Sequence, residues 1–126
     1  MTQEDKEILL KDLCARLPYN VICQVEFRES GKYQSKSMFL SGVFTDEAYF
    51  TTESGSIYSN EYKPYLFPLS SMTDEQEEEY NDLNCCELGC FPHTEEALDY
   101  LIKNHFDYRG LIEKELAIDA TNLNIY

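Results

Sequence analysis

Four side chains of the kind that bind metal ions lie in one short stretch of the sequence: Cys85, Cys86, Cys90 and His93. Thiolate and imidazole groups are the usual ligands of tetrahedral zinc. Structural zinc sites usually place two ligands on a short knuckle and two more at a distance, whereas here all four residues crowd into one loop. The spacing therefore favours a loop with partly buried thiols, and we expect neither a bound metal nor an organic cofactor.

A run of carboxylates precedes this loop and contains no basic residue. Calcium loops alternate their oxygen ligands around a central glycine, and the run has neither feature. Its pairs Asp74/Glu78 and Glu75/Glu79 place like charges one helical turn apart, each opposing a helix by about 0.2 to 0.5 kcal/mol. The run therefore predicts either a solvated face that maintains solubility or a surface for a basic partner. The acidic residues are Asp74, Glu75, Glu77, Glu78, Glu79 and Asp82.

A third group of side chains combines an imidazole, a carboxylate, a phenol and a guanidinium, in His105, Asp107, Tyr108 and Arg109. Together with Tyr65 these residues could line a ligand pocket in which the planar fork of Arg109 holds an anion. They equally suit the end of a helix, where His105 faces the helix dipole and Arg109 pairs with Asp107 or a backbone carbonyl. We favour the helix-ending interpretation and keep the five residues as the candidate binding site.

Nucleophilic catalysis has little support in the sequence. Ser70 and Ser71 occupy no strand–turn–helix elbow, and no glycine-rich loop of the phosphate-binding type occurs. A thiol–imidazole pair such as Cys86 with His105 is the remaining route to an enzyme. We therefore expect a protein without a catalytic residue and keep a small Cys/His enzyme as an alternative.

The composition is that of one folded domain spanning residues 1–126. Apolar residues make up 43% of the chain and aromatic residues 13%, which is enough to build a core. The 10 basic and 24 acidic residues give a formal net charge of −14, which argues against direct binding to nucleic-acid phosphates. Without a signal peptide or membrane span, and with an odd number of cysteines, the sequence predicts a cytoplasmic protein with reduced thiols. We expect Cys14 and Cys23 to be buried.

The first half of the chain predicts a helix followed by a meander of strands. Thr2 can cap the helix and Pro18 ends it. Alternating apolar and polar residues then predict strands over 21–27, 37–44, 48–52 and 56–62, separated by turns such as Ser30–Gly31. These strands form either a small SH3-like barrel or an open antiparallel sheet packed on helices.

The second half predicts an extended segment and two helices. Pro64 and Pro68 deny residues 63–69 two ladder donors, so this segment should run over the sheet edge. Thr73 and Gln76 have the spacing of a capping box for a helix over the acidic run, and Thr94 can cap a third helix that packs on the sheet. Residues 111–118 suit a helix or a strand. The fold class is α+β, with an N-terminal helix, a four-stranded meander and two C-terminal helices.

Three stretches of the sequence carry a family resemblance: KDLCARLPY at 11–19, KPYLFPLSSMT at 63–73 and HFDYRGLI at 105–112. They resemble a family of short uncharacterised proteins from gut Bacteroides species, their prophages and mobile elements. The resemblance covers both ends and the middle of the chain, in order. It implies a cytoplasmic bacterial protein, possibly carried by a phage, and it brings no activity, ligand or catalytic residue.

These observations together predict a non-catalytic module that binds a protein through the acidic run or an aromatic surface near Tyr65 and Tyr108. One alternative is a phage-type inhibitor that imitates DNA or captures a nucleotide, and another is the Cys/His enzyme. We expect no direct contact with nucleic acid and no membrane association, and we leave the oligomeric state open.

Overall fold

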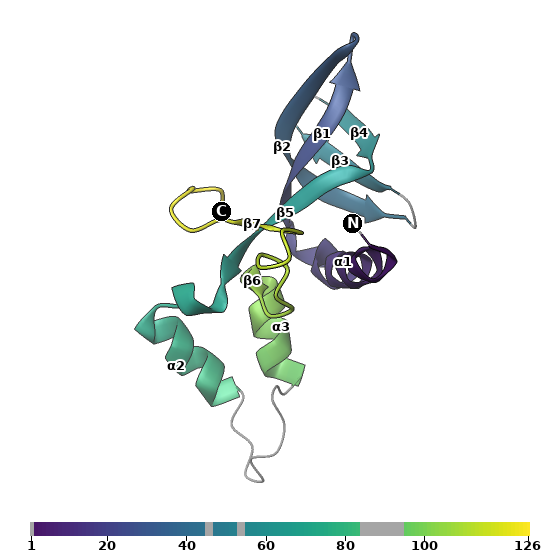
Figure 1. The fold of residues 1–126 in the computed structure, drawn as a ribbon. Helices are drawn as coiled ribbons and strands as arrows, with labels where there is room; N and C mark the ends of the chain where they lie inside the picture. The colour runs from purple at the N-terminus through teal and green to yellow at the C-terminus, as the bar shows by residue number, and fades with distance from the viewer. Residues whose placement is uncertain (1, 45–46, 53–54, 84–94) are drawn as a thin grey trace.

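The computed structural model describes residues 2–44, 47–52, 55–83 and 95–126 and confirms the α+β class. Figure 1 shows a curled sheet with α1 beside it and with α2 and α3 together at its lower end. The helices are α1 (Gln3–Arg16), α2 (Asp74–Leu83) and α3 (Glu95–Lys103), with 3-10 turns at Leu17–Tyr19 and Leu69–Ser71. The strands are β1 (Ile22–Glu29), β2 (Lys32–Val43), β3 (Ala48–Thr52), β4 (Gly55–Ser59), β5 (Glu61–Pro68), β6 (Phe106–Asp107) and β7 (Ile118–Asp119).

Helix α1 begins and ends where the sequence predicts. The Thr2 hydroxyl accepts a hydrogen bond from the Asp5 amide at 3.1 Å, and the Asp5 carboxylate accepts one from the Thr2 amide at 3.2 Å. This reciprocal capping satisfies two amides that the first turn leaves without helical partners. The buried stripe of α1 contains Asp12 and Arg16, whereas Cys14 is exposed. The prediction that Cys14 is buried was therefore wrong, because it projects about 100° away from the buried Leu13.

The meander is built from hairpins. Ser30 and Gly31 have φ values of 53° and 78°, the left-handed geometry of a two-residue turn whose twist matches that of the paired strands. This turn lets β1 run to Glu29 and β2 start at Lys32, so the two strands extend beyond their predicted bounds. Strands β3 and β4 then add antiparallel pairs, and β4 lies at one edge of the sheet.

Strand β5 corrects two predictions. The expected strand over 56–62 is divided into β4 and β5, and residues 63–69 lie largely within the sheet instead of running over its edge. The first half of β5, up to Pro64, pairs antiparallel with β1. Its second half pairs in parallel with β7 and β6, up to Pro68. Each proline lies at the end of a ladder, where a missing amide donor costs little.

The same pairing explains why the sheet is open and the SH3-like barrel was the wrong alternative. The strand order is β4-β3-β2-β1-β5-β6, with β7 also paired to β5. A barrel would need β4 to pair with the free edge of β1. Strand β5 occupies that edge along Cys23–Glu26, so β4 curls toward β1 without joining it.

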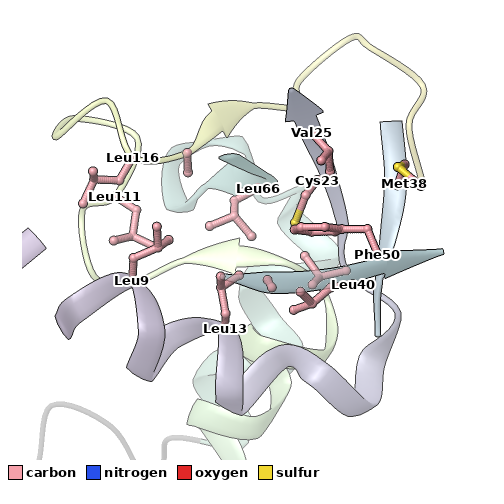
Figure 2. Close-up of a cluster of buried hydrophobic side chains, with 13 residues drawn as sticks. Leu9, Leu13, Cys23, Val25, Met38, Leu40, Phe50, Leu66, Leu111 and Leu116 are labelled. Atoms are coloured by element: carbon pink, nitrogen blue, oxygen red, sulfur yellow. The ribbon is translucent and has the colours of Figure 1, made fainter. Parts of the chain in front are cut away.

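The core lies between α1, the sheet and the C-terminal segment. Leu9 and Leu13 of α1 face Leu66 of β5 and Leu111 and Leu116 of the C-terminal segment (Figure 2). Within the undecided segment 111–118, residues 111–115 form turns and 116–117 a bend, and only Ile118 belongs to a strand, as the first residue of β7. Helix α3 contacts α1, α2 and β6, and its buried side chains lie outside the main core cluster. None of the described helices has the length and apolar character that a membrane crossing would require.

Candidate functional site

The predicted binding residues follow α3 directly, and His105 ends that helix. Its φ of 64° is left-handed, a conformation that often follows the last residue of a helix. The His105 amide donates to the Ile102 carbonyl at 3.1 Å, and the His105 carbonyl accepts from the Phe67 amide at 2.8 Å. His105 therefore ends α3 and joins it to β5.

Asp107 is buried and its carboxylate organises the following turn. It accepts hydrogen bonds from the backbone amides of Arg109 at 3.2 Å, Leu111 at 3.0 Å and Ile112 at 2.9 Å. A carboxylate that accepts several amides is well satisfied in its charged form. Asp107 thus fixes the start of the segment that carries Leu111 into the core, and its oxygens are engaged in that role.

Arg109 pairs with Asp12 of α1 instead of the predicted Asp107 or a carbonyl. Its Nε lies 3.3 Å from Asp12 Oδ1. Arg16 donates from Nε to Asp12 Oδ2 at 2.7 Å and from Nη2 to the Phe106 carbonyl at 2.6 Å. The Tyr108 ring lies near both guanidinium groups, with its centroid 5.7 Å from Cζ of Arg16 and 4.8 Å from that of Arg109. We call Asp12, Arg16, Tyr108 and Arg109 the Asp12 cluster.

The Asp12 cluster is a buried ionic group. Asp12 and Arg16 are both 0% exposed, so each depends on the other for compensation of its charge. Burial, followed by the charge of Asp12, raises the pKa of the neighbouring Cys23 thiol, which makes Cys23 a poor nucleophile. The cluster joins α1 to the β6 segment and contains no activated nucleophile.

His105 lies beside this cluster and stacks on Tyr126. The two ring centroids are 3.8 Å apart with an interplanar angle of 13°. Burial, and to a lesser extent the charge of Arg16, lowers the pKa of His105 to about 4, so its imidazole is neutral at pH 7. The Tyr126 hydroxyl donates to the Tyr65 carbonyl at 2.8 Å and accepts from the Ile22 amide at 2.9 Å. These contacts attach the C-terminal residue to β1 and β5.

Tyr65, the last predicted binding residue, is 8% exposed. Its ring therefore contributes little to any surface near Tyr108. The structure brings His105, Asp107, Tyr108 and Arg109 together and adds Asp12, Arg16 and Tyr126, which the sequence interpretation missed. The i, i+4 spacing of Asp12 and Arg16, in line with Leu9 and Leu13, was the available signal.

The acidic run forms α2, and its predicted capping box is confirmed. The Thr73 hydroxyl accepts from the Gln76 amide at 3.1 Å, and the Gln76 side chain accepts from the Thr73 amide at 3.0 Å. The helix has no buried residue, and all six carboxylates that the sequence singled out are exposed. Glu79 accepts a hydrogen bond from the Tyr100 hydroxyl of α3 at 2.9 Å. Burial, together with this bond, raises the pKa of Tyr100 to about 12.

The cysteine-rich loop with Cys85, Cys86, Cys90 and His93, for which we expected partly buried thiols and no metal, lies outside the described residues, as does the Cys86 of the Cys/His alternative. Among the residues that are described, no group of three or more His, Cys, Asp or Glu side chains could hold a metal ion. Cys14 is exposed and Cys23 is buried, both as free thiols.

Comparison with known proteins identified no relative: no family model, no curated protein and no solved structure matches the chain.

Proposed function

We propose that the protein is a non-catalytic module that binds a basic partner protein through the exposed carboxylates of α2. The observation that carries the proposal is that all six acidic side chains of this helix are exposed, and that no ion pair within the described residues involves them. The other predicted site is occupied by internal contacts, because Asp107 and Arg109 bind groups of their own chain.

The local stability of α2 does not account for its acidic residues. Carboxylates in the first turn, such as Asp74 and Glu75, interact favourably with the helix dipole. Asp82 lies in the last turn, where the dipole favours a cation, and that turn holds no basic residue. The like-charged pairs Asp74/Glu78 and Glu75/Glu79 add repulsion. Lysine and arginine side chains of a partner would relieve both penalties.

The test compares two variants with the same net charge. The α2 variant carries Glu75→Gln, Glu78→Gln and Asp82→Asn, and the control carries Glu4→Gln, Glu7→Gln and Glu113→Gln at exposed positions elsewhere. Each is used as bait in a Bacteroides lysate, the source that the family resemblance indicates, and the retained proteins are quantified by mass spectrometry. We expect one basic protein to be retained by the wild type and the control, to be lost from the α2 variant and to dissociate as salt is raised.

Equal retention by both variants, or no specific retention by the wild type, would contradict the proposal. Release of the retained partner by duplex DNA would identify α2 as an imitation of nucleic-acid phosphates, which is the inhibitor alternative.

A further inference from the structure

The open seam between β4 and β1 forms a hollow on the face of the sheet. Because β5 occupies the edge of β1, β4 approaches β1 without a ladder, and the Ser59 hydroxyl of β4 donates to the Glu26 carbonyl of β1 at 2.7 Å. In Figure 1, β4 lies close behind β1 at this side of the curled sheet. The hollow is open to solvent, has a volume of about 530 Å³ and is lined by residues of β1, β2, β4 and β5 together with Glu47 and Asn60, so it can hold one side chain of a partner. We call it the seam hollow.

Carboxylates are concentrated in the seam hollow. Glu26 and Glu61 lie directly opposite each other in the β1–β5 ladder, and Glu47 is part of the same lining. Like charges in direct cross-strand pairs are destabilising. Arg28 also lines the hollow, but within the described residues the three carboxylates form no ion pair. The hollow therefore keeps an excess of negative charge that the fold itself does not neutralise.

The hydroxyl group of Tyr33 is hydrogen-bonded to two of these carboxylates. The Tyr33 hydroxyl lies 2.9 Å from Glu26 Oε2 and is also hydrogen-bonded to Glu61. A phenol has one proton to donate, so it satisfies one carboxylate at a time. The hydrogen bond to Glu61, followed by that to Glu26, raises the pKa of Tyr33, which keeps the proton on the phenol. Within the part of the chain that the structure describes, this pair of carboxylates thus has more acceptor capacity than the Tyr33 hydroxyl can satisfy.

Aromatic rings provide the other lining of the hollow. Tyr33 is 56% exposed, and Tyr58, whose ring also contacts those of Tyr49 and Phe44, is 57% exposed. The Phe27 side chain packs against the core on the other face of β1, so the rings that a ligand could contact are those of Tyr33 and Tyr58. The face of an aromatic ring attracts a cation. A ligand that complements both the carboxylates and the aromatic rings is a cation that donates several hydrogen bonds and stacks on a ring.

We propose that the seam hollow binds an arginine side chain of a partner protein. A planar guanidinium donates parallel hydrogen bonds to carboxylates and stacks on aromatic rings, whereas an ammonium is a compact, more strongly hydrated charge that cannot stack. Free arginine would bring its own carboxylate among Glu26, Glu47 and Glu61, and an arginine within a peptide does not. This surface is separate from α2, so the inference holds whether or not α2 binds a partner.

The test is an NMR titration of the ¹⁵N-labelled protein with the capped peptide acetyl-Gly-Arg-Gly-amide. We expect saturable shifts confined to amides around Glu26, Tyr33, Tyr58 and Glu61, with a dissociation constant on the order of 1 mM because one side chain makes few contacts. The matched lysine peptide should bind about fivefold more weakly or worse, because it lacks the planar fork. Free arginine should also bind more weakly than the capped peptide.

Two variants make the test specific. Glu61→Gln should weaken the arginine peptide about tenfold by removing a charged acceptor, and Tyr58→Ser should weaken it about threefold by removing a ring. Both side chains are exposed, and unchanged distant amide shifts will show that the variants fold. The α2 variant should bind the peptide as the wild type does.

Absence of saturable shifts would overturn the inference, as would equal binding by the Glu61→Gln variant. Equal affinity for the lysine peptide would overturn the assignment to a guanidinium. Equal affinity for free arginine would overturn the assignment to a partner protein, and loss of binding in the α2 variant would overturn the separation of the two surfaces.

Discussion

The Asp12 cluster and the seam hollow both contain carboxylates beside aromatic rings. Within the described residues, the carboxylate of the Asp12 cluster is paired with cations and those of the seam hollow are not. In the Asp12 cluster one buried carboxylate has two guanidinium partners, and the nearby Asp107 accepts three backbone amides. In the seam hollow three carboxylates form no ion pair within the described chain, and two of them share one phenol. The fold uses the first set of charges for its own assembly and leaves the second set available to another molecule.

The largest expected effect is at Asp12. Replacing it with alanine leaves Arg16 charged and buried without its carboxylate, so we expect a loss of about 3 to 5 kcal/mol in the free energy of unfolding. Urea denaturation measures this loss. The control Glu7→Ala removes an exposed carboxylate from the same helix and should change stability by less than about 0.5 kcal/mol.

A second variant tests whether the cost comes from the unpaired charge. The double substitution Asp12→Leu with Arg16→Met removes both charges and keeps apolar volume, so it should cost less than Asp12→Ala alone. If Asp12→Ala were as stable as the Glu7→Ala control, the Asp12 cluster would not stabilise the fold.

His105 gives the next effect, which depends on pH. Its pKa is lowered to about 4 in the folded protein, from 6.5, so the unfolded chain binds the proton first as pH falls. The stability from the neutral imidazole is fully present above pH 6.5 and declines as pH falls toward 4. Between pH 6.5 and 5 we expect a loss of about 1 kcal/mol or less, because solvent screens the charge of the partly exposed ring.

The matched variant is His105→Asn, because asparagine tolerates a left-handed backbone and does not titrate. Chemical denaturation at several pH values should show a flatter profile for this variant between pH 6.5 and 5. An unchanged profile would mean that another group controls the pH dependence.

The smallest expected effect is at Glu61, in the seam hollow. Glu61→Gln removes one of two like charges that face each other across β1 and β5, so stability should stay the same or rise by a few tenths of a kcal/mol. Thermal unfolding measures the change. A loss of more than about 1 kcal/mol would show that this carboxylate is part of the folded framework, and the contrast with Asp12 would disappear.

Local features of the fold could be predicted from the sequence. The Thr2 and Thr73 caps, the Ser30–Gly31 turn and the end of α3 depend on neighbouring residues and were confirmed. The pairing of β5 could not be predicted, because two prolines indicated an edge position and only the returning β6 and β7 supply the second ladder. Long-range pairing of this kind leaves little local signal.

The candidate site, too, could be predicted only where its contacts join residues that are close in sequence. The helix-ending role of His105 follows from residues close in sequence, whereas Arg109 binds a carboxylate from α1 at the other end of the chain. The i, i+4 spacing of Asp12 and Arg16 indicates an ion pair, and only their alignment with Leu9 and Leu13 pointed to the burial that the structure shows. The seam hollow could not be predicted from the sequence, because Glu26 and Glu61 become neighbours only when β1 and β5 pair.

The two ladders of β5 also determine when the chain can fold during synthesis. Its first half pairs with a strand already made, but its second half needs β6 and β7, and the core needs Leu111 and Leu116. Until Leu111 and Leu116 have emerged from the ribosome, the nascent chain lacks the side chains that cover Leu9, Leu13 and Leu66 in the folded protein. Folding therefore has to wait until residues 106–119 have been made, and until then the exposed apolar face is prone to aggregation.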